Sequence, residues 1–235
     1  MNFQLLQYLF QRVFLSTLFC FGCFAAAQPA GLLYDPEPPA DSAYIRVIHA
    51  SRDGAIDILV DGRLRISKLG TGEASDYMVL GAGKRVIAVH SAGKPTASLT
   101  TTLEVVPGRA MTVALTTMRA GSAPVLFEDK ANSNKLKAIL AVYHLDADAG
   151  PLDILSADGN TKVFSGVSFG SPAFLQVNPI AVDLVAVKAG SKESRASTSL
   201  SMTQGGTYSI LLLPGAGGKP IARALQNKIE RYSGK

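Results

Sequence analysis

The sequence predicts an all-β protein with two tandem β-sandwich domains, which arise from an internal duplication and follow an N-terminal signal peptide. Three observations predict this fold. From Tyr44 onward, short runs rich in Val, Ile and Thr are separated by Gly, Asp and Asn, which is typical of strands and turns. The runs recur roughly every 8 to 12 residues without helical periodicity, as in a sandwich. The same order of runs then occurs again about 95 residues later.

An apolar segment precedes the predicted domains. Residues 13–27, VFLSTLFCFGCFAAA, are uncharged, follow Arg12 and end in small residues suited to cleavage. This order predicts a cleaved Sec-type signal peptide over 1–27 and a secreted protein that starts at Gln28. An uncleaved anchor is the alternative, but the run is shorter than the roughly 20 residues that span a bilayer. Both cysteines lie in this segment, so we expect no disulfide and no Cys-bound metal in the mature chain.

The first predicted sandwich spans 44–126 and follows a Pro-rich lead-in over 28–43. Its opening stretch, IRVIHASRDGAIDILVDG at 45–62, is interpreted as the first hairpin of the domain. Asp61-Gly62, which stands between two strand-like runs, indicates a type I′ turn, because both central residues of that turn need positive φ.

The second predicted sandwich spans 138–225. Its opening stretch, LAVYHLDADAGPLDILSADG at 140–159, repeats that of the first domain and aligns the pairs His49 and His144, Asp57 and Asp153, and Asp61-Gly62 and Asp158-Gly159. A polar joint over 127–137 is expected between the domains, and a basic tail over 226–235 is expected after them.

The joint has its own composition. FEDKANSNKLKA at 127–138 alternates charged and amide residues and contains Lys130, Lys135 and Lys137. Two interpretations stay open. The segment is either a solvated linker, or an exposed docking strip or hinge between the sandwiches.

The charge of the chain limits its partners. Without Arg12, 22 of the 23 basic residues remain against 18 acidic ones, an excess of about four positive charges. There is no Trp and no basic run interleaved with aromatics, so we expect no nucleic acid partner. This charge permits weak contact with an anionic polysaccharide such as a uronate polymer.

His49 and Asp57 raise the hypothesis of a catalytic base and the carboxylate that orients it. The duplication argues against catalysis, because both residues recur at the same strand positions as His144 and Asp153. Catalytic residues are rarely kept in both copies of a duplicated domain, whereas structural residues commonly are. The sequence therefore favours a structural role for both pairs, and no catalytic residue is assigned.

Other chemistry is equally weakly supported. His90 aligns with Val187, and the three histidines lack zinc-ligand spacing, so we expect no metal and no cofactor. No Gly-x-Ser-x-Gly or Gly-Asp-Ser block is present, and the Gly-rich stretches at 70–75 and 215–218 are interpreted as turns. A carboxylate pair for glycoside hydrolysis is conceivable, but a polar loop explains the same residues: Asp146, Asp148, Asp153 and Asp158.

Four blocks resemble the alginate O-acetylation accessory protein family, AlgF. They follow in order through nearly all of the mature chain: Gly31-Leu32-Leu33-Tyr34, Ser42-Ala43-Tyr44-Ile45-Arg46-Val47, Asn134-Lys135-Leu136-Lys137-Ala138-Ile139 and Asn178-Pro179-Ile180. The chain departs from that pattern by an inserted Leu33, and by His49 and His144 where the family pattern has Asn.

The resemblance implies a periplasmic, non-enzymatic component of an exopolysaccharide acetylation apparatus, with alginate as the expected polymer. Its partners would be a membrane-bound O-acyltransferase and periplasmic SGNH-type acetyltransferases. An alternative is a polysaccharide-binding β-domain protein of an acetylated-cellulose or other exopolysaccharide system, although no Trp is available for sugar stacking. A third hypothesis, an enzyme that uses His49 and Asp57, belongs to a different class.

Overall fold

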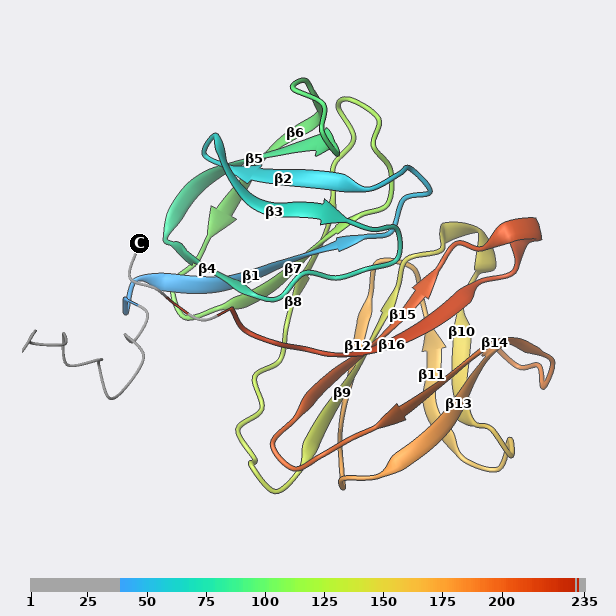
Figure 1. Cartoon of the computed structure of the whole chain (residues 1–235). Helices are drawn as coiled ribbons and strands as arrows, with labels where there is room; N and C mark the ends of the chain where they lie inside the picture. Colours follow the sequence, from blue (N-terminus) through green and yellow to red (C-terminus); the bar gives the residue numbers. More distant parts are fainter. Residues whose placement is uncertain (1–38, 231, 233–235) are drawn as a thin grey trace, which may run out of the picture. The chain divides into compact units, whose positions relative to one another are not determined.

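The computed structural model describes residues 39–230 and 232. The predicted signal peptide (1–27) and most of the predicted lead-in lie outside the described residues. The described part contains four four-stranded sheets in two pairs, and its remaining regular elements are two short 3₁₀ helices (Figure 1). The predicted all-β class with two sandwiches is therefore confirmed.

The first sandwich consists of two sheets with the strand orders β4-β1-β7-β8 and β3-β2-β5-β6. Its strands are β1 (Ser42–His49), β2 (Ile56–Val60), β3 (Arg63–Leu69), β4 (Met78–Gly81), β5 (Gly83–Ser91), β6 (Ala97–Val105), β7 (Ala110–Leu115) and β8 (Val125–Glu128).

The second sandwich has the strand orders β12-β9-β15-β16 and β11-β10-β13-β14. Its strands are β9 (Ala138–His144), β10 (Leu152–Ser156), β11 (Lys162–Val167), β12 (Pro172–Val177), β13 (Ala181–Lys188), β14 (Ser194–Ser201), β15 (Thr207–Leu213) and β16 (Ile221–Gln226). The 3₁₀ helices η1 (Ala147–Ala149) and η2 (Ala216–Gly218) follow β9 and β15.

The two sandwiches have the same topology. Adding eight to each strand number of the first sandwich gives the strand order of the second. Both also contain a parallel pair in an otherwise antiparallel sheet, β1 with β7 and β9 with β15. A parallel pair between the first and seventh strands is a specific connection, so its recurrence supports the internal duplication.

The predicted turn is present in the first copy and altered in the second. Asp61 and Gly62 have φ values of 50° and 78°, as a type I′ turn between β2 and β3 requires. In the second copy β10 and β11 are joined by a longer loop, in which the Asp158 carboxylate accepts the backbone N–H of Asn160 at 3.1 Å.

The predicted hairpin at 45–62 is wrong. β1 and β2 do not pair, because β1 lies between β4 and β7 whereas β2 lies between β3 and β5 in the opposite sheet. The chain therefore crosses from one sheet to the other between His49 and Ile56. Alternation and turn residues identify the strands but not their partners, and β1 pairs with β4 and with β7, whose paired residues are 33–39 and 66 positions away.

Three apolar cores hold the described residues together. Each sandwich has one core between its two sheets. The third joins the outer faces of the β1 and β9 sheets and contains Ile48, Phe127, Tyr143 and Leu211 among its members. The β1 and β9 sheets are therefore covered on both faces. β9 is buried at all seven positions, whereas β2 alternates between buried and half-buried residues.

The joint and the tail both contribute to this contact. The predicted joint over 127–137 begins inside β8, where Phe127 is buried in the shared core. After β16 the chain runs to the first sandwich, where Tyr77 N–H donates to Lys228 O and Glu230 N–H donates to Tyr77 O, both at 2.8 Å. The segment 227–230 thus ties the second sandwich to the β4 edge of the first. The bounds of the two domains, 44–126 and 138–225, stay a prediction.

We expect Leu211→Ala to lower the free energy of unfolding by about 2–5 kcal/mol, because it leaves a cavity in the shared core. Leu136→Ala is the matched control, since Leu136 is 69% exposed, and it should change stability by less than about 0.5 kcal/mol. Urea denaturation measures both. A single transition for the wild type is also expected, and two well-separated transitions would contradict a shared core.

Candidate functional site

The two histidines that the duplication aligns, His49 and His144, make the same structural contact in their copies. His49 Nε2 lies 3.0 Å from Gly54 O, and His144 Nε2 lies 2.7 Å from Gly150 O. Because a carbonyl can only accept, each ring donates from Nε2. His144 Nδ1 then accepts Asp146 N–H at 3.3 Å. Each imidazole therefore fastens the end of its strand to the following loop.

The two aspartates that the duplication aligns, Asp57 and Asp153, accept hydrogen bonds from backbone N–H groups. Asp57 accepts the N–H of Lys68 at 2.7 Å and that of Gly93 at 3.0 Å. Asp153 accepts Gly166 N–H and Lys162 Nζ, both at 2.7 Å. These donors hold the pKa of each carboxyl below its usual range, through backbone N–H groups at Asp57 and chiefly through the Lys162 ammonium at Asp153.

These contacts explain why Asp recurs in both copies. Lys68 and Gly166 each have positive φ, 53° and 59°, where the third strand of its copy is irregular. A carboxylate on the neighbouring strand stabilises this bend by accepting its N–H. The structure brings neither Asp57 nor Asp153 into a hydrogen bond with a histidine, since the recorded partners are other groups.

The remaining candidates have local roles. His90 Nδ1 lies 3.1 Å from Lys94 O in the turn after β5. Asp146 caps η1 by accepting Asp148 N–H at 3.2 Å. Among the residues that the structure describes, no three His, Cys, Asp or Glu side chains group as they would around a metal ion. No helix in that same part of the chain is long and apolar enough to cross a membrane.

A buried arginine is the centre of the contact between the sandwiches. Arg46 on β1 is fully buried and donates to side chains from both halves of the chain. Its Nε donates to Thr112 Oγ1 at 2.8 Å, Nη2 to Ser209 Oγ at 3.1 Å, and Nη1 to Asn227 Oδ1 at 2.6 Å. Ser209 also donates to Asn227 Oδ1 at 2.7 Å. The guanidinium thus replaces its lost water with three oxygen acceptors.

Two tyrosine rings flank the same guanidinium. Arg46 Cζ lies 4.8 Å from the ring centroid of Tyr77 and 5.0 Å from that of Tyr143, within cation–π range. Both phenols donate to the Asp129 carboxylate, which also accepts Thr112 Oγ1–H at 2.6 Å. Burial raises the pKa of Tyr77 and Tyr143 above their usual range, which Arg46 opposes and Asp129 reinforces. Both phenols therefore stay protonated and act as donors.

A pocket of about 530 Å³ opens beside this network, and we call it the seam pocket. Its lining comes from β1, the residue before β4, β7, the joint, the β14–β15 turn with the start of β15, and the end of β16 with the 227–230 segment. The lining residues are Tyr44, Tyr77, Ala110, Asp129, Lys130, Ala131, Asn132, Lys135, Gly205, Gly206, Thr207, Gln226, Asn227 and Ile229. The network fixes one wall, because Tyr77, Asp129 and Asn227 belong to both.

The three lysines of the joint lie in two different environments. Lys130 and Lys135 are exposed and line the seam pocket. Lys137 instead donates from Nζ to Asn178 Oδ1 at 2.5 Å. Asn132, between the two pocket lysines, donates to Lys137 O at 3.0 Å and accepts Asn134 N–H at 3.2 Å, which gives the joint a defined course.

One residue in the sequence points to this site. Arg46 interrupts an otherwise apolar strand run, and a charge at a strand centre is rare unless it is paired. Its partners could not be found in the same way, because Thr112, Ser209 and Asn227 are separated from it by 66, 163 and 181 positions.

A family model described as "Domain of unknown function (DUF4397)" matches residues 43–155. This match covers the first sandwich and extends into β10 of the second. It therefore crosses the predicted joint.

Curated relatives match over more of the chain. The "Alginate biosynthesis protein AlgF" of Pseudomonas aeruginosa is 28% identical over 196 residues, 83% of each chain. The protein of the same name from Pseudomonas putida is 27% identical over 83% of this chain and 82% of its own. A solved structure of the C-terminal domain of AlgF from P. aeruginosa aligns with 40% of this chain and 100% of its own, at 27% identity and a TM-score of 0.34. The resemblance to AlgF that the sequence predicted is confirmed.

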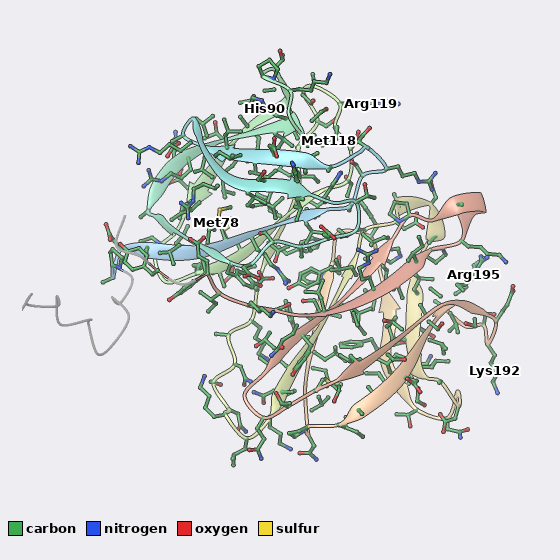
Figure 2. The ribbon with its side chains drawn as sticks, in the orientation of Figure 1. Met78, His90, Met118, Arg119, Lys192 and Arg195 are labelled. Carbon is green, nitrogen blue, oxygen red and sulfur yellow. The ribbon has the colours of Figure 1, made fainter. Side chains whose placement is uncertain are left out.

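We expect Arg46→Ala to lower the free energy of unfolding by about 3–5 kcal/mol, because removal of one member of a buried charged network leaves its partners unpaired. Arg119→Ala is the control, since Arg119 is exposed on an outer loop of the first sandwich (Figure 2). Thermal denaturation compares the two variants. Equal stability of the two variants would show that the Arg46 network does not hold the sandwiches together.

Stability should also fall in mild acid because of His144. Burial lowers the pKa of the His144 imidazole, so the unfolded state binds the proton more readily. The contribution is present in full above the unfolded-state pKa of about 6.5 and is lost as pH falls from there through the folded-state pKa. Urea midpoints between pH 7.5 and pH 5 measure this, and His144→Gln should show a flatter profile. An unchanged profile in the variant would assign the acid sensitivity to other groups.

Proposed function

We propose that this AlgF-like protein is a periplasmic accessory protein required for O-acetylation of an exopolysaccharide, with alginate as the first polymer to test. The observation that carries the proposal is the match to two curated AlgF proteins over more than four fifths of each chain. Because a match of 196 residues in a chain of 235 must include residues of both sandwiches, more than a single shared module is compared.

A non-catalytic role is part of the proposal. The His49 and Asp57 pair was the catalytic hypothesis, and both of its members are committed to backbone groups that shape strand ends. His144 and Asp153 repeat these contacts in the second copy. A residue used identically in two copies is explained by the fold, so it provides no support for an enzyme.

The adaptor role we propose is to link a membrane-bound O-acyltransferase with periplasmic SGNH-type acetyltransferases. Exposed strand edges support such a role, since their free backbone groups can pair with a strand of another protein. β6 is nine residues long, and its recorded pairing is with β5 on one side. The residues of β6 that are not buried are small or polar rather than large and apolar, as suits a reversible contact: Ala97, Ser98, Thr100, Thr101, Thr102 and Glu104.

The test is deletion of the gene followed by NMR measurement of acetyl groups on the secreted polymer. We expect polymer of normal length without acetyl groups, and recovery with the wild-type gene. His49→Gln and His144→Gln, if folded, should also restore acetylation, whereas loss with either folded variant would support the enzyme hypothesis. Fractionation of the complemented strain tests the periplasmic location, and acetylation that persists after deletion would refute the proposal.

A polysaccharide-binding protein of an acetylated-cellulose or other exopolysaccharide system is the second candidate. The seam pocket favours it, because the pocket offers polar side chains at a fixed place on the surface. Acetylated cellulose in place of acetylated alginate in the deletion experiment would distinguish the two systems.

A further inference from the structure

One end of the second sandwich carries exposed aliphatic side chains among lysines, and we propose that it rests on an anionic phospholipid surface. At this end Ala138 of β9 pairs with the last residue of β12, and Ile139 pairs with the first residue of β15. Three segments therefore lie side by side: the later part of the joint (130–137), the β12–β13 turn (178–180) and the β14–β15 turn (202–206). We call these three loops together the joint end.

Two large apolar side chains stand at the tips of these loops. Leu136 is 69% exposed and Ile180 is 54% exposed. Lys137, the neighbour of Leu136, donates from Nζ to Asn178 Oδ1 at 2.5 Å. Because Asn178 and Ile180 share one short turn, the two apolar tips lie near each other. A single exposed aliphatic residue needs no explanation, but two on neighbouring tips form a small apolar contact point.

The loop that carries Leu136 is held by its own side chains. Asn132 Oδ1 accepts Asn134 N–H at 3.2 Å, and Asn134 Oδ1 accepts Leu136 N–H at 3.0 Å. The carbonyl of Lys137 accepts Gly205 N–H at 3.0 Å from the neighbouring turn. Backbone groups that are already paired cost less to remove from water. Leu136 can therefore enter a lipid interface without unfolding of its loop.

The charge of the joint end suits phosphate headgroups. Lys130 and Lys135 are exposed, Lys137 is half-buried, and none of the three loops contains Asp or Glu. The carboxylates that come next, Asp158 and Asp183, belong to the outer sheet of this sandwich and its loop, and packed sheets lie about 10 Å apart. Lysines near an anionic membrane each add to its attraction, so these loops favour an anionic surface over a neutral one.

A lipid surface fits the joint end better than a protein does. Two apolar side chains fall far short of the roughly 20–30 residues a side that a stable protein interface uses. At a membrane, by contrast, a few inserted apolar side chains and nearby cations act together to hold a protein on the surface. A second copy of this chain also fits less well, because a symmetric contact would place Lys130 and Lys135 against the same lysines of the other copy.

The experiment mixes the protein purified from its producing cells with lipid vesicles and measures the bound fraction by sedimentation. We expect binding to vesicles that contain phosphatidylglycerol, and binding about tenfold weaker or less to vesicles of phosphatidylcholine alone. Leu136→Ser combined with Ile180→Ser should weaken binding to the phosphatidylglycerol vesicles about tenfold or more, because the apolar contact is lost. Ile221→Ser is the matched control and should leave binding unchanged, since Ile221 is 51% exposed at the opposite end of the same sandwich, where β16 begins.

A second pair of variants tests the charge. Lys130→Glu combined with Lys135→Glu should weaken binding to the phosphatidylglycerol vesicles about tenfold or more, because both exposed cations of the joint end are reversed. Lys192→Glu is the matched control, since Lys192 is an exposed lysine at the β13–β14 turn (Figure 2), and should leave binding unchanged.

Three results would overturn the inference. One is the lack of binding to phosphatidylglycerol vesicles by the wild type. Another is an equal loss with the control variants, or no loss with the Leu136 and Ile180 pair, which would indicate unspecific attraction between a basic protein and an anionic surface. The last is self-association or binding of polyglutamate in place of vesicle binding, which would assign the joint end to a second copy or to an acidic protein segment. The proposed function fails separately, since it depends on acetyl content after gene deletion and not on vesicle binding.

Discussion

The burial of the Arg46 guanidinium between two sandwiches is the constraint on which the rest of the structure depends. A charge without water needs compensation, and here Thr112 comes from the first sandwich while Ser209 and Asn227 come from the second half of the chain. Neither half alone completes the set, so the cost of burying Arg46 is offset only when both halves pack together. The seam pocket depends on the same requirement.

The shared core explains why the burial pattern of the two inner sheets, which contain β1 and β9, differs from that of the two outer sheets, which contain β2 and β10. The β1 and β9 sheets are covered on both faces, and their central strands are buried at almost every position, whereas β2 and β5 alternate because one face meets water. A duplicated sandwich with one exposed sheet would present an apolar face, and packing the two copies against each other covers it. The histidines and aspartates then serve each copy separately, as contacts at strand ends and bends.

The proposed adaptor role is compatible with this division. The inner sheets and the Arg46 network are occupied in holding the sandwiches together, which leaves the outer sheets, their edge strands and the rim of the seam pocket for other molecules. Lys130 and Lys135 come from the joint, so this segment is more than a spacer. Of the two interpretations of the joint, the contacts of Asn132 and Lys137 favour a fixed strip over a freely solvated linker.

By itself, the sequence determined the all-β class, the duplication, the Asp61-Gly62 turn and the resemblance to AlgF, because these depend on local periodicity, turn chemistry and ordered blocks. Only the tertiary structure decided that β1 pairs with β7 rather than β2, and that Arg46 meets residues up to 181 positions away. Strand periodicity carries no information about which distant strand supplies a partner. A buried charge selects its acceptors by their positions in space, which the packing of both sandwiches sets.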